Sequence, residues 1–295
     1  MTYPTIIIGG PTASGKSDFA LRLAQKVNGV IINGDSMQVY KDVPILTATP
    51  YHEDHRQNIP HKLYGYLEAF EKNDVMKWLI ETQKSIEESK KNQCTPIIVG
   101  GTGFYLSALI HGLSAIPPVS LSVQEELVED MNTQGLPALF QRLESCDPQI
   151  ALKIDPCDRQ RILRALGVFQ TTQKPLSFWQ KEKGTPLKGP YGVIHMDVHR
   201  NILKERADER FLKMLQEGGL EEAYQLWKKG YHFDTCPLSR VIGVKELGQY
   251  FDGKITQEEA ITLSQIHTRQ YIKRQQTWFK NQWSTREIMR IDHNT

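Results

Sequence analysis

GGPTASGKS, residues 9–17, is the stretch that decides the fold. Gly10 is followed by four residues and then by Gly15, Lys16 and Ser17, which is the Walker A spacing. Such a loop joins a strand to a helix, and its backbone N–H groups and the helix dipole point at one anionic group. Lys16 adds a point charge, and Ser17 adds a hydroxyl for Mg²⁺. The predicted phosphate site comprises Gly10, Pro11, Thr12, Ala13, Ser14, Gly15, Lys16 and Ser17.

Four short β-branched runs predict a parallel sheet around this loop. They cover residues 5–8, 30–33, 96–99 and 192–198, and helix-like stretches separate several of them. This alternation is typical of α/β proteins with crossover helices. We therefore predict an α/β fold with a P-loop NTPase-like parallel sheet core. Ligands collect beyond the carboxyl ends of such strands, so the residues that follow each run are the first candidates for a site.

The chain changes character between the third and the fourth run. Residues 116–120 and 183–192 are rich in Pro and Gly, and the sequence between them is helix-like, with Asp-Pro helix starts at Asp147 and Asp155. The predicted division is a helical insertion at 117–189 and an α/β core at 1–116 and 190–295.

Composition limits the class of protein. The chain has 295 residues, of which 39% are hydrophobic, and a net charge of only +2, so a polyanionic partner must meet a local basic surface. Its four cysteines form no CxxC pair, which argues against a zinc module or a disulfide scaffold. No segment approaches the ~20 apolar residues that cross a bilayer, and no secretion leader precedes the first run. We expect a cytoplasmic protein without a membrane partner.

Acidic residues near the strand ends are candidates for chemistry. The run 96–99 leads into GGTGFY (100–105) without an acid, although phosphoryl transfer normally uses one there. Asp35 lies two residues beyond its run, where it could face a reacting group or cap a turn. Asp197 lies within its run, which favours a structural role.

The stretch GGTGFY is a second glycine-rich turn. Its glycines let the backbone approach a ligand closely, and Thr102 offers a hydroxyl there. A tight strand-to-helix turn would need the same glycines without any chemistry, so the motif by itself leaves both interpretations open.

Basic side chains cluster at the spacing of one helix face in three places. The clusters are Arg161 with Arg164, Arg206 with Arg210, and Arg269 with Lys273 and Lys280. A capping box, Thr256 with Glu259, predicts that the last cluster lies on a long C-terminal helix. Any single cluster also fits a solvated helix. Three of them on a chain of near-neutral charge favour a bound polyanion, whose phosphates they would position.

Five motifs follow one another along the chain: GPTASGKS (10–17), GDSMQVY (34–40), VGGTGFYL (99–106), DRQRILRAL (158–166) and TRQYIKRQQTWF (268–279). Together they resemble the motifs of the bacterial tRNA dimethylallyltransferases, the tRNA adenosine-37 isopentenyltransferases, over nearly the whole chain. The resemblance implies that the phosphate loop holds dimethylallyl diphosphate with Mg²⁺ near Ser17. It implies that the prenyl group passes to N6 of adenosine 37 and that pyrophosphate leaves.

The resemblance also implies a role for each matching residue. Asp35 would take the proton of the adenine amine, Thr102 would meet the bridging oxygen, and Lys16 with Arg206 or Arg210 would stabilise the leaving pyrophosphate; spacing does not choose between the two arginines. A single chain would clasp the tRNA anticodon stem-loop with its insertion. The tRNA-binding residues, with two members of the basic stripe added, would be Asp35, Ser36, Met37, Gln38, Thr102, Gln160, Arg161, Ile162, Leu163, Arg164, Arg240, Lys245, Arg269 and Lys273.

Three other functions stay open. A P-loop small-molecule kinase would bind ATP and use Asp35 as base or metal ligand, but the missing acid after 96–99 and the basic C-terminal helix argue against it. An adenylate isopentenyltransferase would prenylate a free nucleotide, whereas the basic clusters and the intact insertion favour tRNA. A non-catalytic RNA-binding protein would not need the complete set of Gly15, Lys16 and Ser17.

Overall fold

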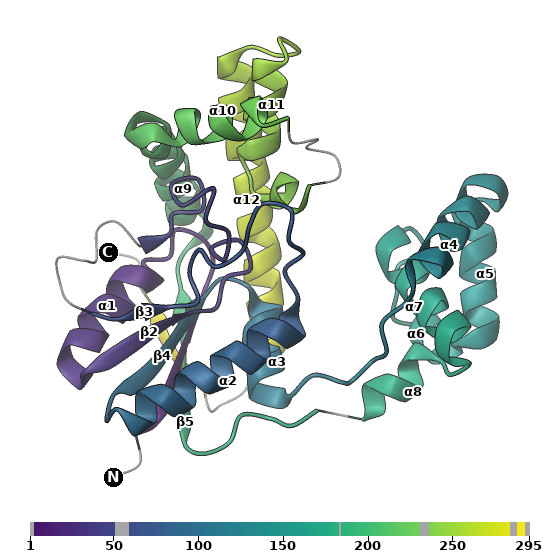
Figure 1. Cartoon of the computed structure of the whole chain (residues 1–295), viewed down its shortest axis with the longest axis horizontal. Helices are drawn as coiled ribbons and strands as arrows, with labels where there is room; N and C mark the ends of the chain where they lie inside the picture. Colours follow the sequence, from purple (N-terminus) through teal and green to yellow (C-terminus); the bar gives the residue numbers. More distant parts are fainter. Residues whose placement is uncertain (1–2, 51–58, 183, 231–235, 284–287, 293–295) are drawn as a thin grey trace. The chain divides into compact units, whose positions relative to one another are not determined.

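The computed structural model describes residues 3–50, 59–182, 184–230, 236–283 and 288–292. Packing divides the chain into two units. The core unit comprises Met1–Leu109 and Lys188–Thr295, and the helical unit comprises Ile110–Leu187. The helical unit overlaps most of the insertion predicted at 117–189. Because the placement of one unit on the other is not determined, each is described by itself (Figure 1).

The core unit is built on a parallel sheet. In the described residues this sheet has six strands in the order β3-β2-β4-β1-β5-β6. Their bounds are β1 Thr5–Gly9, β2 Gly29–Asn33, β3 His61–Lys62, β4 Thr95–Gly100, β5 Tyr191–Asp197 and β6 Ile288–Asp292. The predicted α/β fold with a parallel sheet is confirmed, and the four predicted runs coincide with β1, β2, β4 and β5. The edge strands β3 and β6 are not among the predicted runs.

The central strands are buried on both faces, as a parallel sheet requires. On one face, Ile8 and Ile97 pack with Ala20 and Ala24 of helix α1 (Lys16–Val27). The next residues along these strands, such as Ile98, point to the opposite face and are fully buried as well. Helix α2 (Val75–Lys91) packs on β2 and β4, and helix α3 (Gly103–His111) follows β4.

Local capping signals fix the ends of several helices. Asp74 caps α2, since its Oδ1 accepts the N–H of Met76 at 2.7 Å. The capping box of Thr256 and Glu259 starts helix α12 (Gln257–Gln282) as predicted. Of the described helices, including this one of 26 residues, none is apolar over a stretch long enough to cross a membrane.

The segments between β5 and α12 form a helical layer in the core unit. They are helix α9 (Arg200–Met214), the π-turn Leu215–Gly219, helix α10 (Leu220–Lys228), the 3₁₀ turn Pro237–Arg240 and helix α11 (Val244–Phe251). Helices α9 and α12 lie side by side (Figure 1). Phe211 of α9 packs with Val244 and Leu247 of α11 in a core that also contains Val43, which precedes the segment 44–50. This packing attaches that segment to the helical layer.

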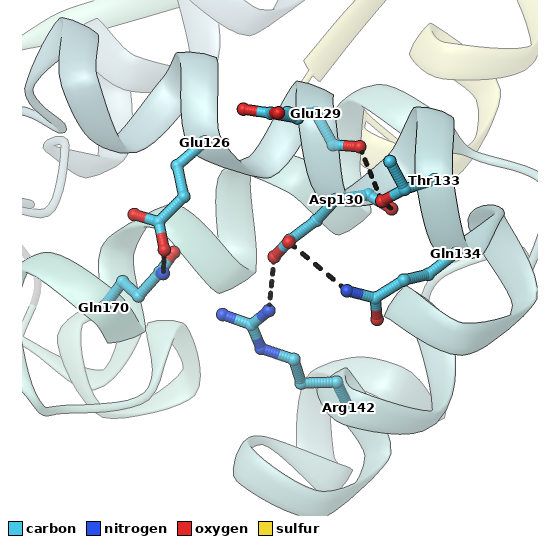
Figure 2. Close-up of polar contacts among 7 residues, drawn as sticks. All are labelled: Glu126, Glu129, Asp130, Thr133, Gln134, Arg142 and Gln170. Carbon is cyan, nitrogen blue, oxygen red and sulfur yellow. Dashed lines mark hydrogen bonds and ion pairs between the residues drawn. The ribbon is translucent and has the colours of Figure 1, made fainter.

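The helical unit has its own apolar core. Its elements are α4 (Leu121–Gln134), α5 (Leu136–Cys146), α6 (Pro148–Ala151), α7 (Arg159–Thr172) and α8 (Leu176–Lys181). Leu127, Leu143 and Leu166 pack together inside it. Figure 2 shows how Asp130 of α4 contacts Arg142 of α5 at 2.8 Å on its surface. Exposed pairs of this kind contribute about 0–1 kcal/mol, so burial of the leucines holds the unit together.

One of the two predicted Asp-Pro helix starts is wrong. Asp147 does cap α6, because its Oδ1 accepts the N–H of Ile150 at 3.2 Å. Asp155 instead accepts the N–H of Cys157 at 2.8 Å and forms a turn. Helix α7 begins after Asp158, whose side chain accepts the N–H of Arg161. Asp158 occupies the N-cap position, so Asp158 and not Asp155 satisfies the first free N–H groups of α7.

Candidate active site

The phosphate loop runs from the end of β1 to the start of α1. Gly15 has φ 79°, a left-handed conformation that glycine adopts without a Cβ clash, and it turns the chain into the helix. Lys16 Nζ folds back to donate to Pro11 O at 3.1 Å. Ser14 is fully buried, and its hydroxyl has no partner in the described residues. The loop therefore combines an α-helix N-terminus, an ammonium group and an unpartnered hydroxyl, as a phosphate site requires.

A cavity of about 920 Å³ opens beside this loop. Its wall includes Lys16 and Ser17, parts of the segment 44–50, and Arg206, Arg210 and Lys213 of α9. The three α9 side chains follow a 4-and-3 spacing and therefore share one helix face. Both arginines predicted for the leaving group line the same cavity as the loop.

Burial tunes the two central cations. It lowers the pKa of Lys16 to about 8, which Asp35 partly opposes by raising this pKa and Arg210 reinforces by lowering it. It also lowers the pKa of Arg210, which Asp35 again opposes. Lys16, Arg210 and Asp35 therefore lie close enough to act on one another electrostatically. Arg206 is not among the charges that shift the pKa of Lys16 or of Arg210.

Asp35 uses one carboxylate oxygen for local structure. Its Oδ1 accepts the N–H of Met37 at 2.9 Å, and Asn33 Oδ1 accepts the N–H of Asp35 at 2.8 Å. Its Oδ2 forms no hydrogen bond within the described residues. A Cβ on Gly101 would lie 3.3 Å from this oxygen, so Oδ2 faces the glycine-rich turn after β4. The turn-capping interpretation of Asp35 holds for one oxygen and leaves the second able to accept a proton.

Thr102 joins the two loops that follow β2 and β4. Its Oγ1 accepts the N–H of Ser36 at 2.9 Å and donates to Ser36 Oγ at 3.1 Å. Both loops begin at the same edge of the sheet, because β2 and β4 are parallel neighbours. The structure thus brings together Asp35, Ser36, Thr102 and the phosphate loop.

Helix α12 supplies side chains that the sequence motifs did not single out. Gln275 is buried, its Oε1 accepts the N–H of Thr12 at 2.9 Å, and its Nε2 donates to Gly101 O at 2.9 Å. Burial raises the pKa of the Tyr271 phenol, and the nearby side chains of Thr102 and Gln275 partly oppose this rise. The spacing of Tyr271, Gln275 and the Trp278 ring packed on Gly103 marks one helix face. This spacing was the sequence signal that could have indicated a site-facing side of α12, but the basic residues of the helix were the more prominent pattern.

The predicted tRNA-binding residues divide into exposed and structural side chains. Gln160, Arg161, Arg164, Arg240, Lys245 and Lys273 are exposed. The Ile162 side chain is fully buried in the core of the helical unit, and Leu163 packs against that core. Arg269 forms an ion pair with Asp208, and Gln38 donates to Thr47 O and Ala48 O at 3.0 and 2.9 Å. Met37 packs on the apolar core beneath the segment 44–50.

A metal ion here would depend on its substrate. No group of three or more His, Cys, Asp or Glu side chains in the described ranges could hold one. Ser17 is exposed and lines the cavity next to Lys16. Mg²⁺ commonly keeps waters and shares one or two protein ligands with substrate phosphates. The residues present therefore fit a cation that arrives with a diphosphate.

The fold and this loop define a P-loop α/β protein with a cation-lined cavity at the carboxyl edge of its sheet. The model of the IPP transferase family matches residues 38–282. The chain belongs to this family, and the resemblance inferred from its motifs is confirmed.

Named relatives are similar over nearly their full length. The tRNA dimethylallyltransferase of Bartonella quintana is 42% identical over 286 residues, which is 96% of each chain. The one of a Bradyrhizobium species is 39% identical over 301 residues, 98% of each.

Two solved structures share the fold. A eukaryotic dimethylallyltransferase acting on tRNA gives a TM-score of 0.85 at 30% identity, covering 99% of this chain and 74% of that one. The tRNA isopentenylpyrophosphate transferase of Bacillus halodurans gives 0.69 at 32% identity, covering 98% and 89%.

Proposed function

We propose that this protein transfers a dimethylallyl group from dimethylallyl diphosphate to N6 of adenosine 37 in tRNA and releases pyrophosphate. One observation carries the proposal: Asp35, whose Oδ2 has no hydrogen bond in the described residues, lies close enough to Lys16 and Arg210 for its charge to act on both. A proton acceptor and two cations for a departing anion are therefore near one another. Membership of the IPP transferase family supports this choice of reaction.

The chemical step needs a base. The lone pair of adenine N6 is delocalised into the ring, so the amine becomes a useful nucleophile only as it loses a proton. N6 attacks C1 of the allyl group, and the C1–O bond breaks with its electron pair going to the diphosphate. The N6 proton passes to Asp35 Oδ2. Because Oδ1 is held by the N–H of Met37, the base keeps its orientation while it accepts the proton.

The step also needs a site for the developing negative charge. Loop N–H groups, Lys16 and Arg210 form a preorganised set of donors, and such sets lower the barrier to charge separation. Thr102 would donate to the bridging oxygen in place of its bond to Ser36 Oγ. When bound, Mg²⁺ next to Ser17 would neutralise part of the diphosphate charge.

The tRNA would be bound mainly by residues other than those that carry out the reaction. We propose that the helical unit clasps the anticodon stem-loop through exposed side chains such as Arg161 and Arg164. Adenosine 37 must leave its stack to reach Asp35, at a cost of about a few kcal/mol. Phosphate contacts position the loop, and the pocket around Asp35 then receives the base. Such a protein, a single chain, would work in the cytoplasm, where tRNA is found.

One experiment separates this function from its rivals. The protein is incubated with labelled dimethylallyl diphosphate, Mg²⁺ and either total tRNA or AMP, and the nucleosides are analysed. Label in a tRNA adenosine is the expected result. Label in AMP instead would assign the protein to adenylate prenylation. In a parallel incubation that also contains ATP, ATP consumption without label transfer would assign it to the kinases.

A further inference from the structure

Gln275, near the end of the chain, connects two loops of its N-terminal part. Its side chain reaches Thr12 of the phosphate loop and Gly101 of the turn after β4, and each hydrogen bond is 2.9 Å long. The residue belongs to α12 and is 5% exposed. No backbone hydrogen bond joins the two loops in the described residues.

The amide group suits this place for a chemical reason. Oε1 meets a backbone N–H and Nε2 meets a backbone carbonyl, so both ends of the amide are used and its orientation is fixed. A Cβ on Gly101 would lie 2.6 Å from Gln275 Nε2, so a larger residue at this position would displace the amide. An apolar or an ionised side chain of the same size would lose at least one of the two bonds.

The two loops carry the two halves of the leaving group's site. Thr12 belongs to the loop that would hold the diphosphate, and Thr102 directly follows the carbonyl that Gln275 binds. Tyr271, one helical turn before Gln275, lies close enough to Gln275 and Thr102 for both side chains to lower its pKa. The face of α12 therefore sets the separation between the phosphate loop and the Thr102 hydroxyl.

We infer that Gln275 is a positioning residue that holds the phosphate loop and Thr102 at the separation that one prenyl diphosphate requires. The inference rests on the proposed function for its substrate. Gln275 touches neither the prenyl group nor the adenine; it acts through Thr12 and Thr102. Misplacement of a reacting group by about 1 Å can cost about 10²-fold in rate, so a loosened bridge should affect the chemical step.

Gln276 provides a matched control on the same helix. Its Nε2 donates to Val198 O at 3.1 Å, so it too ties α12 to a backbone carbonyl, but this carbonyl lies after β5 and outside the two loops. Gln275→Met removes two hydrogen bonds to the backbone, and Gln276→Met removes one. A merely structural role for Gln275 predicts that both variants change the melting temperature and neither changes the chemistry selectively.

The test measures single-turnover rates, the affinity for inorganic pyrophosphate, tRNA affinity and melting temperature for both variants. Gln275→Met should lower the rate about 10- to 100-fold and weaken pyrophosphate binding at least about fivefold, whereas Gln276→Met should leave both within about twofold. The tRNA affinity should stay within about twofold in either variant. Equal behaviour of the two variants overturns the inference.

A double-mutant cycle then tests the route through Thr102. In a Thr102→Ala background, Gln275→Met should lower the rate by less than about threefold, because the hydroxyl that it positions is gone. If the rate losses of Gln275→Met and Thr102→Ala multiply fully in the double variant, the inference is overturned. If Gln275→Met does not fold, Gln275→Glu decides: it keeps the acceptor for Thr12 and loses the donor to Gly101. This variant should keep a larger fraction of the wild-type pyrophosphate affinity than of the wild-type single-turnover rate. A wild-type rate would contradict the positioning role.

Failure of the proposed function is visible separately. If the wild-type protein does not prenylate tRNA, the function is wrong, and the pyrophosphate affinities of the two methionine variants still test the bridge. If wild type prenylates tRNA and the variants match each other, only the role of Gln275 is wrong.

Discussion

Glu222 Oε1 accepts the backbone N–H of Ile45 at 2.8 Å, and its Oε2 accepts that of Leu46 at the same distance. Glu222 belongs to α10, and Ile45 lines the cavity beside the phosphate loop. Burial raises the pKa of this carboxyl to about 7, although both backbone hydrogen bonds oppose the rise. A single titratable side chain thus fixes one wall of the cavity.

Stability should follow the protonation of Glu222. Between its unfolded pKa of about 4.3 and its folded pKa of about 7, the folded state binds a proton that the unfolded state has released. The free energy of unfolding should therefore fall as the pH rises through about 7, and this term is absent in Glu222→Gln. Urea unfolding of both proteins between about pH 5 and about pH 8 measures the difference. Curves that run parallel over this range would contradict the assignment.

Binding of pyrophosphate should depend on the charge of Lys16. Its pKa of about 8 means that the ammonium is lost as the pH rises above that value, and an uncharged Lys16 attracts the anion less. Lys16→Arg keeps its charge throughout, so it serves as the reference for any titration of pyrophosphate itself. Calorimetry from about pH 7 to about pH 9 should show wild-type affinity falling relative to that of Lys16→Arg. A constant ratio would rule out Lys16 as the titrating group.

Asp35→Asn should abolish turnover without disturbing the loop. The Asn Oδ1 can still accept the N–H of Met37, but the amide cannot take the N6 proton. We expect single-turnover rates to fall about 10²- to 10⁴-fold while tRNA affinity stays within about twofold. Asp197→Asn is the control, since Asp197 is exposed at the end of β5. Comparable rates for the two variants would remove Asp35 as the base.

Arg210 should matter more than Arg206 for the leaving group. Both line the cavity, but Arg210 is the one whose charge acts on Lys16 and Asp35. Arg210→Gln should lower the single-turnover rate about 10²- to 10³-fold, and Arg206→Gln should lower it less. Lys213→Gln, which removes the exposed partner of Glu217, should lower it least. The reverse order of the two arginines would show that Arg206 carries the charge of pyrophosphate.

Neighbouring residues of α7 should separate RNA binding from folding. Arg164 is exposed, so Arg164→Gln should weaken tRNA binding and reduce the slope of log affinity against log salt by about one, without lowering the melting temperature. Ile162 is fully buried, so Ile162→Ala should destabilise the helical unit by about 2–5 kcal/mol. Thermal unfolding and filter binding at several salt concentrations measure both effects. A salt slope unchanged by Arg164→Gln would place the RNA elsewhere.

Features that depend on neighbours in the sequence were predictable. The glycine spacing of the phosphate loop, the four β-branched runs and the capping box at Thr256 are patterns of residues close in sequence, and each forms as expected. Asp155 failed for the same local reason, because Asp158 lies nearer the first free N–H groups of α7. The buried side chain of Ile162 shows the limit of a motif, since a run of adjacent residues on a helix includes both faces.

The amino-acid sequence by itself determined which loops and helices form and which residue types end each strand, because local backbone geometry and apolar periodicity are written in consecutive residues. Only the tertiary structure decided which distant groups meet. Gln275 binds Thr12 across 263 positions and Glu222 binds Ile45 across 177, and no local pattern specifies such pairs. They arise because α10 and α12 pack against the loops at one edge of the sheet, where burial makes each of these polar groups find a partner.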